Sequence, residues 1–505
     1  MSVIHRDVLA NQTETLDQMT EFVGNRRELL AGATVAALGL GAVAANAQGA
    51  TYTPHASWRS LERRLVRRLT NGITLDDVRK SLQLGFEGYL EYQLNPEAID
   101  DSVVATKVAA TWPTLTMTPR QLYSTTDDMV PKQLTEATIY RSTFSKRQLY
   151  ERMVEFWSDH FNIHLYKDDC FYLKTYDDRL VIRRFALKTF RELLNASARS
   201  SAMLVYLDNA SSRVGDPNQN YARELMELHT IGVDGGYTQR DVEEVARCFT
   251  GWTYIGNKEL PTAGQFFFDV DAHDDGAKVV LGHRIPAGGG YNDGLRVLGI
   301  LGNLPQTHQF IGRKLCRWLL RYDPPQSLVN EVAATFASTN GNIKAMIRTI
   351  MTRANLTAAP AKLKRPNHLI MSLLRSLNAT VTTFDSLRWS TYDIMGMGPF
   401  EWAPPNGYPD SNNFWSGLML PRWNCGFDLC RGYLDGVTVD IPAFLGTATT
   451  PAQILAKINE KLFAGEINPA ENAALFKFLT TGELNDGRIL DSIGLAACMP
   501  SYQHF

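Results

Sequence analysis

Apolar residues recur at intervals of three and four along most of the chain, the spacing that places them on one face of an α-helix. Strict alternation of apolar and polar residues, which is typical of a half-buried strand, is rare. The pattern predicts a helix over residues 57–70 with a serine cap, and a second over residues 74–94 that Thr74 opens and Asn95-Pro96 stops. The chain is therefore expected to be mainly α, a multi-helix body.

The sharpest helix signal covers Gln239–Phe249. Thr238 stands in the N-cap position and Asp241 follows three residues later, which is a capping-box spacing, and Gly251 is a terminator. Its predicted core stripe consists of Val242, Val245, Ala246 and Phe249.

Three segments break the helical pattern. Residues 265–270 (QFFFDV) and 278–281, separated by Asp274-Asp275-Gly276, predict one short β-hairpin near residues 265–282. Residues 286–294 and 395–415 are long Pro/Gly-rich loops, and the second is also dense in Asn and aromatic residues. Loops of this length and composition are typical of binding or lid elements.

The N-terminus predicts an exported protein. Asn25-Arg26-Arg27 precedes an uncharged Ala/Gly/Leu/Val run, and Ala45-Asn46-Ala47 is a small-x-small cleavage pattern. Residues 1–47 are therefore interpreted as a twin-arginine signal peptide, and the mature protein as periplasmic or secreted. The alternative, a membrane anchor, is disfavoured because the run is only about 17 residues long and weakly apolar, where a span needs about 20 strongly apolar residues.

The remaining chain divides, on this reading, into a main helical domain at 48–355 and a C-terminal helical part at 356–505. The boundary near residues 355–366 is weak, and one continuous helical body fits the pattern equally well. No later segment holds 18 uninterrupted apolar residues, so no stable membrane span is expected after cleavage.

The composition excludes some classes of function but does not identify one. The chain has 505 residues, 44% hydrophobic and 21% charged, with a formal charge of -2, which is typical of a globular protein and predicts no nucleic-acid partner. The dense basic cluster at residues 59–68 is interpreted as a solvated helix face. Of the six cysteines, Cys248 and Cys316 are expected to be buried thiols. Whether Cys425 and Cys430 pair is open, and their lone C-x4-C spacing is weak evidence for zinc.

Seven contiguous segments carry a family resemblance: 67–94, 152–161 (RMVEFWSDHF), 203–209 (MLVYLDN), 220–233 (NYARELMELHTIGV), 236–242 (GYTQRDV), 273–282 (HDDGAKVVLG) and 404–409 (PPNGYP). Through them the chain closely resembles the bacterial family catalogued as domain of unknown function 1800, from about Leu61 to the C-terminus. The resemblance implies an exported, mainly helical protein, often encoded beside a sulfatase-like partner, and no established activity. Where the family commonly has Phe-Trp-His-x-His-Phe, this chain has Ser158 in place of the first histidine.

Two histidines are candidate metal ligands on a helix predicted over residues 148–166. His160 and His164 are four residues apart and fall on the face that carries Leu149, Met153 and Phe156. Such a pair can hold one metal ion, although the glutamate of the helical zinc motif is missing. The alternative is that both are hydrogen-bonded core residues.

Glu224 and Glu227 are candidate catalytic carboxylates. Helical geometry around residues 222–230 places them roughly opposite His229, so they and His229 cannot easily share one ion. The alternative is an ion-pair network with Arg223 that only fixes packing.

The predicted hairpin turn supplies the last candidates, His273 as a metal ligand and Asp275 as an acid or base. An EF-hand is disfavoured because its twelfth position is Gly282 rather than Glu. A turn held by Asx-type hydrogen bonds is the alternative.

Together these residues favour a hydrolase-like enzyme in which a divalent metal ion would polarise the scissile group. The alternative function is a non-catalytic envelope protein that binds or assembles with a sulfatase-like neighbour. Neither hypothesis identifies a substrate.

Overall fold

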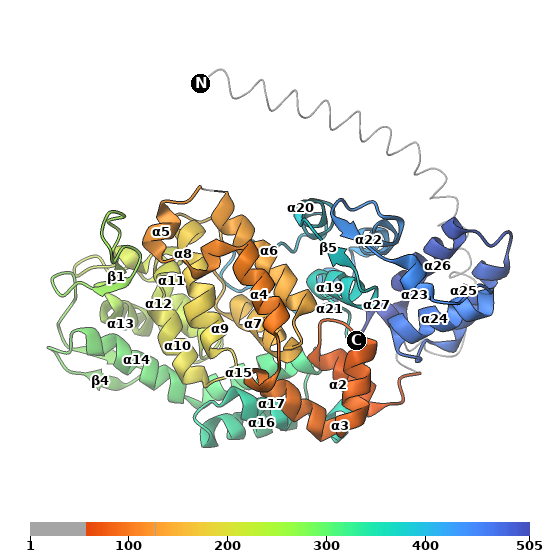
Figure 1. Ribbon diagram of the computed structural model, residues 1–505. Helices are drawn as coiled ribbons and strands as arrows, with labels where there is room; N and C mark the ends of the chain where they lie inside the picture. The colour runs from red at the N-terminus through yellow and green to blue at the C-terminus, as the bar shows by residue number, and fades with distance from the viewer. Residues whose placement is uncertain (1–56, 127) are drawn as a thin grey trace.

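A computed structural model describes residues 57–126 and 128–505. The predicted signal peptide at 1–47 lies outside the described residues. Helices dominate, and the only strands in the described part form three two-stranded antiparallel sheets (Figure 1). The mainly α prediction is therefore confirmed. Among the described residues, no helix combines the length and apolar character that crossing a membrane requires.

Helices occur throughout the described chain. Those of the first part are α2 (Leu61–Leu69), α3 (Leu75–Leu94), α4 (Ser102–Thr111), α5 (Pro119–Tyr123), α6 (Met129–Phe144), α7 (Gln148–His160), α8 (Cys170–Asp177), α9 (Arg183–Phe185), α10 (Phe190–Ala198), α11 (Ser201–Tyr206), α12 (Asn220–Glu224) and α13 (Gln239–Phe249). The later ones are α14 (Tyr291–Asn303), α15 (Pro305–Leu319), α16 (Gln326–Ser338), α17 (Ile343–Ile350), α18 (Arg353–Ala358), α19 (Pro366–Ser376), α20 (Asp385–Leu387), α21 (Asn412–Trp415), α22 (Met419–Arg431), α23 (Ile441–Leu445), α24 (Pro451–Phe463), α25 (Pro469–Thr480), α26 (Asp486–Cys498) and α27 (Pro500–Gln503).

Six short segments have a helical pitch other than α. Three are 3₁₀ turns: η1 (Pro96–Ala98), η2 (Pro113–Thr116) and η4 (Asn209–Ser211). Three are π-helical: η3 (Asp178–Ile182), η5 (Leu225–His229) and η6 (Arg388–Asp393). A π turn inserts an extra residue into a helix and changes the face on which the following side chains lie.

Local capping explains where several helices begin. Ser60, rather than Ser57, caps α2 through its hydroxyl, which accepts from Arg63 N at 3.2 Å. Thr74 caps α3 as predicted, and Thr238 with Asp241 forms the predicted capping box of α13. The predicted stripe of α13 is entirely buried.

The predicted pairing of the hairpin strands is wrong. Strand β2 (Phe266–Phe268) pairs with β1 (Trp252–Tyr254), and β3 (Lys278–Val280) pairs with β4 (His283–Ile285). Leu281 and Gly282 both have positive φ angles, 49° and 79°, so a two-residue primed turn joins β3 directly to β4. The remaining sheet joins β5 (Thr380–Val381) to β6 (Val437–Thr438).

Buried apolar side chains gather in two large clusters. One draws mainly on residues from Leu65 to Ala359, and the other on α4, α6 and residues from Leu369 to Tyr502. Helix α6 touches α7, α8 and α19. In Figure 1 the last residue lies beside α2, although the two are at opposite ends of the described chain. The six cysteines are free thiols, including Cys425 and Cys430 on α22.

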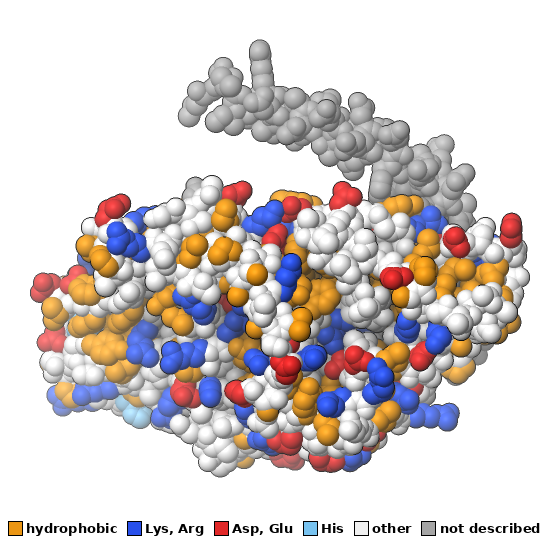
Figure 2. All heavy atoms as spheres, in the orientation of Figure 1, with side chains coloured by type: hydrophobic (Ala, Val, Ile, Leu, Met, Phe, Trp, Pro, Cys, Tyr) orange, Lys and Arg blue, Asp and Glu red, His pale blue; other side chains and the backbone are white. Residues whose placement is uncertain are grey.

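The surface carries both signs of charge. On the face shown in Figure 2, Lys and Arg are interspersed with Asp and Glu, and hydrophobic side chains occur between them. This distribution agrees with the formal charge of -2.

Candidate functional site

The candidate histidine His160 is the last residue of helix α7. Phe156 and Trp157 bury the preceding turn in the core. The helix stops at His160 rather than continuing to residue 166, because the following backbone is held by the 395–415 loop: Leu165 N donates to Phe400 O at 2.9 Å. His164 is therefore off the helix and partly exposed, so the predicted i, i+4 pairing with His160 is wrong.

Both ring nitrogens of His160 have partners. Its Nε2 lies 3.1 Å from His229 O and its Nδ1 lies 2.9 Å from Lys314 Nζ. An ammonium only donates, and a carbonyl only accepts, so Nδ1 accepts from Lys314 and the Nε2 proton is donated to His229 O. Burial, reinforced by the charge of Lys314, holds the pKa of His160 well below its usual value. The ring is thus a neutral acceptor that orients Lys314.

His229, the last residue of the π-helical segment η5, lies beside His160. Its backbone carbonyl meets His160, and the two rings lie 6.0 Å apart. Burial, with Lys314 as a smaller contribution, lowers the pKa of His229 to about 3, so this ring is also neutral at physiological pH.

Lys314, on α15, and Asp159, on α7, have pKa values shifted toward neutrality. Burial lowers the pKa of Lys314 to about 8, and Asp159 partly opposes that shift. Burial raises the pKa of Asp159 to about 6, opposed by Arg365, whose Nη2 lies 2.7 Å from Asp159 Oδ2. The Asp159 side chain nevertheless keeps 19% of its surface exposed. Its Oδ2 atom, which faces Arg365, is buried, so the exposed surface belongs to the rest of the side chain.

The 395–415 loop is fastened over the end of α7. Asn162 Nδ2 donates to the carbonyls of Trp402 and Pro404 at 2.8 Å each. Gly407 has a φ of +70°, and a Cβ there would lie 2.1 Å from Asp159 O, so only glycine permits this approach. The loop thus borders Asp159, while its predicted role as a lid stays a prediction.

His273 lies in a different buried network. Its Nδ1 lies 2.8 Å from Thr250 O, and its Nε2 lies 3.5 Å from Asp293 Oδ2. Lys278 Nζ contacts the same carboxylate oxygen at 2.7 Å, and both side chains of that ion pair are 0% exposed. The ammonium of Lys278 therefore takes the position beside His273 and Asp293 that a bound metal ion would occupy. Asp275, in contrast, is exposed, and its carboxylate accepts from Gly290 N at 3.3 Å.

Glu224 and Glu227 are half-buried at the surface, on the opposite side of the helix from buried His229, as helical geometry predicted. Tyr237 OH donates to Glu227 Oε1 at 2.6 Å, and Arg223 lies 3.6 Å from the same oxygen. Burial, followed by repulsion from Glu227, raises the pKa of Glu224.

The structure does not gather the candidate residues into one centre. In residues 57–126 and 128–505, no group of three or more His, Cys, Asp or Glu side chains is arranged to hold a metal ion. Metal binding by His160, His164 and His273 stays a prediction. Sequence reasoning missed Asp159, although it lies inside the FWSDHF motif. It also missed Lys314, within α15, and Arg365, immediately before α19, because neither has a distinguishing local signal.

The comparison with protein families finds one match. The model of the family described as "Protein of unknown function (DUF1800)" covers residues 64–504, nearly the whole chain, as the resemblance implied. No curated protein and no solved structure matches the chain.

Proposed function

This chain belongs to the DUF1800 family, and we propose that it is an exported hydrolase-like enzyme whose proton-transfer groups are Asp159 and Lys314. The observation that carries the proposal is that Asp159, near the end of α7, and the histidine-bound Lys314, on α15, lie near enough for each charge to shift the pKa of the other. Acid and base pairs of this kind are typical of catalytic sites.

Each side chain has a distinct role in the proposed reaction. Near pH 7, Asp159 is mainly a carboxylate and takes a proton from water, whose oxygen forms a bond to the scissile centre. Lys314 is mainly an ammonium and donates a proton as the bond to the leaving group breaks. The proton on Asp159 then returns to Lys314 through solvent, which restores both groups.

His160 and Arg365 are positioning residues. His160 accepts one of the three N–H groups of Lys314 and leaves two for a substrate. Arg365, which also contacts Glu155 at 3.1 Å, fixes the Asp159 carboxylate from the buried side. In this proposal, Glu224, Glu227 and Asp275 take no part in the reaction.

Export rests on the sequence of residues 25–47, the twin-arginine pattern followed by a small-x-small cleavage site. We place the mature protein in the periplasm or outside the cell. A fractionation experiment with Arg26→Lys and Arg27→Lys together tests this part separately: export that is unaffected would refute the twin-arginine route.

The enzyme proposal is tested with natively exported protein and a panel of p-nitrophenyl acetate, phosphate, sulfate and glycosides. We expect turnover of at least one class, and a reduction of kcat by about 100-fold or more in Lys314→Met, the usual contribution of a general acid. Lys457, on α24, keeps 38% of its side chain exposed, so Lys457→Met is the matched control. Absence of turnover by the folded wild-type protein on the whole panel, or equal kcat in Lys314→Met, would refute the proposal.

A further inference from the structure

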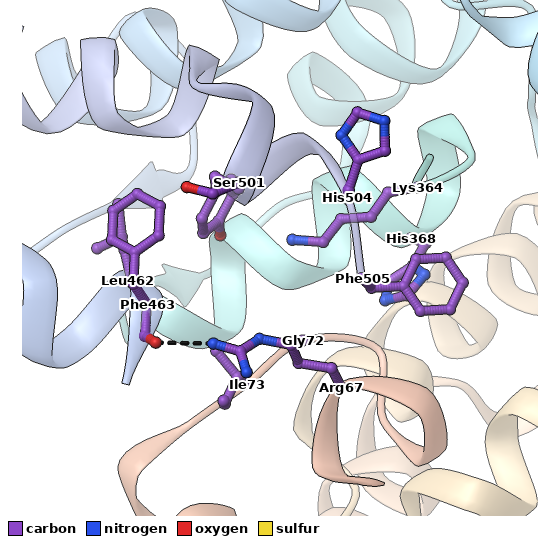
Figure 3. A pocket seen from close by; sticks show the side chains of 11 residues that line it. Arg67, Gly72, Ile73, Lys364, His368, Leu462, Phe463, Ser501, His504 and Phe505 are labelled. Atoms are coloured by element: carbon purple, nitrogen blue, oxygen red, sulfur yellow. Dashed lines mark hydrogen bonds between the residues drawn. The ribbon is translucent and has the colours of Figure 1, made fainter. Parts of the chain in front are cut away.

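Two pockets of the described chain differ in the space that they offer. The one in Figure 3 lies between Arg67, Lys364 and His368 and has a volume of about 10 Å³. The other, the α4–α6 cleft, lies between the end of α4, α6 and residues 381–385, and its volume is about 180 Å³. A cavity needs about 10 to 15 Å³ for each water molecule, so the first has room for about one water and the second for about twelve or more. Of the two, only the α4–α6 cleft can hold an organic ligand.

Three segments that are distant in the sequence build this cleft. Lys132, Glu136 and Tyr140 are four residues apart along α6 and therefore share one face of the helix. Trp112 is the C-cap residue of α4, and Phe384 lies between β5 and α20. These five side chains all line the cleft.

The segment at 381–385 is held in place from behind. Strand β5 pairs with β6, and the next residue, Thr382, donates its N–H to Gly436 O at 2.7 Å. Gly436 has a φ of +76°, and a Cβ there would collide with Thr383, so only glycine permits this approach. The wall is therefore formed before a ligand arrives, as is usual for small-molecule sites.

Aromatic rings provide the apolar part of the cleft. The Trp112 ring centre lies 5.4 Å from that of Tyr140 and 5.8 Å from that of Phe384. Trp112 and Phe384 are only 2% and 5% exposed, so most of each ring belongs to the core. Tyr140 is half-buried and supplies the ring surface that a ligand can cover.

Hydrogen-bonding groups remain available beside these rings. Glu136 accepts from Trp112 Nε1 at 2.7 Å through Oε2, while its Oε1 lies 3.9 Å from Lys132 Nζ, which is too far for a hydrogen bond. Lys132 Nζ contacts both carboxylate oxygens of Asp385, at 2.8 and 2.9 Å, and has a third N–H group. Burial raises the pKa of Glu136, so a donor from a ligand would stabilise its charged form.

The charges that line the cleft are balanced. They are two cations, Lys107 and Lys132, and two carboxylates, Glu136 and Asp385. An ion of either sign would be repelled as well as attracted by this set. A neutral hydroxyl group avoids the repulsion, because it can donate to a carboxylate and accept from an ammonium. Lys107, Thr382 and Asp385 are exposed, so the cleft is open to solvent.

We propose that the α4–α6 cleft binds one neutral pyranose ring, either a free sugar or one residue of a glycan. The C–H groups of the sugar pack against Tyr140, one hydroxyl donates to Glu136 Oε1, and another accepts from Lys132 Nζ. The roughly 12 non-hydrogen atoms of a hexose match a space for about twelve waters. The cleft contains neither Asp159 nor Lys314, so this inference goes beyond the proposed function and fails or holds separately from it.

The test is a titration of the whole exported protein, followed by saturation-transfer difference NMR. One arm uses the methyl glycosides of glucose, galactose and mannose and N-acetylglucosamine; the other uses maltotriose, cellotriose and chitotriose. We expect a Kd on the order of 1 mM for at least one of these sugars, since a ligand with so few atoms gains little free energy. Equal affinity for a monosaccharide and its trisaccharide identifies a free sugar as the ligand, and tighter binding of the trisaccharide identifies a glycan.

Glu136→Gln is the decisive variant. Its amide oxygen can still accept from Trp112 Nε1, so the fold is retained, while loss of the charge weakens sugar binding by about 10-fold. Glu227→Gln is the matched control and should keep the wild-type Kd, because Glu227 also accepts from an aromatic side chain, Tyr237, and lies 3.6 Å from an arginine, but away from the cleft.

Tyr140→Leu tests the ring surface independently and should weaken binding by about 3-fold or more. Its control is Tyr92→Leu, at a half-buried tyrosine of α3. Glycine betaine and free arginine are titrated in parallel. Binding of these charged compounds without binding of any sugar, no binding of any compound, or sugar binding that neither Glu136→Gln nor Tyr140→Leu weakens, overturns the proposal.

Discussion

Replacement of Asp293 by Asn should reveal whether the network around His273 is structural. The Asp293 carboxylate contacts Lys278 at 2.7 Å and His273 at 3.5 Å, and neither Lys278 nor Asp293 is exposed to solvent. Asn has nearly the same shape as Asp, so the packing is retained and the negative charge alone is lost. Lys278 is then left as a buried ammonium without a counter-ion.

The magnitude follows from the burial of the pair. Loss of one partner from a buried ion pair costs about 3 to 5 kcal/mol. Unfolding entropy of about 2.1 cal/mol/K per residue gives roughly 0.9 kcal/mol/K for a body of about 450 residues, so the Tm should fall by about 3 to 5 °C if the chain unfolds in one transition.

Scanning calorimetry of the wild type, Asp293→Asn and Asp275→Asn measures this difference. Asp275 is exposed, so its substitution is the matched control and should change the free energy of unfolding by less than about 0.5 kcal/mol. The double variant Lys278→Met with Asp293→Leu, which removes both charges, should recover most of the lost stability. A fall of less than about 1 °C in Asp293→Asn would show that the pair does not stabilise this region, and would refute the structural interpretation of His273.

Three further predictions concern the candidate sites. Asp159 must be ionised to act as a base and Lys314 protonated to act as an acid, so the kcat of the enzyme should rise as pH passes about 6 and fall as it passes about 8; a profile that is flat from pH 5 to 9 would contradict these roles. Gly407→Ala should lower the Tm more than Gly396→Ala, since both glycines have positive φ but only a Cβ at position 407 collides with the backbone of Asp159, and equal Tm values would show that the loop moves aside freely. Glu224→Gln, at a half-buried position, should leave kcat unchanged and the free energy of unfolding within about 0.5 kcal/mol; a folded but inactive variant would instead support the catalytic role predicted from the sequence.

Features that depend on a few neighbouring residues could be predicted from the sequence. The caps at Thr74 and Thr238 satisfy helix N–H groups within three residues, so local chemistry determines them. The burial of His229 and the partial exposure of Glu224 follow from helical spacing, even though η5 has a π pitch. The family assignment likewise rests on contiguous motifs.

Features set by distant segments could not be predicted. The end of α7 depends on Phe400, 235 positions from the Leu165 amide that it binds, and the end of that helix decides the position of His164. The primed turn joins β3 to β4 and so excludes the predicted pairing of β3 with β2. It requires a positive φ at Leu281, which leucine rarely adopts. Lys314 and Arg365 acquire their surroundings only when α15 and α19 pack near α7.

The ion pair between Arg67 and Glu466 joins residues 399 positions apart. At a synthesis rate of about 5 to 20 residues per second, Glu466 is made about 20 to 80 s after Arg67. For that interval Arg67 lacks its carboxylate partner on the nascent chain, although α3, which packs against α2, has already been made. The molecule therefore completes its fold after translation rather than during it, and an export route that accepts only folded cargo would have to hold the chain in the cytosol until Glu466 arrives.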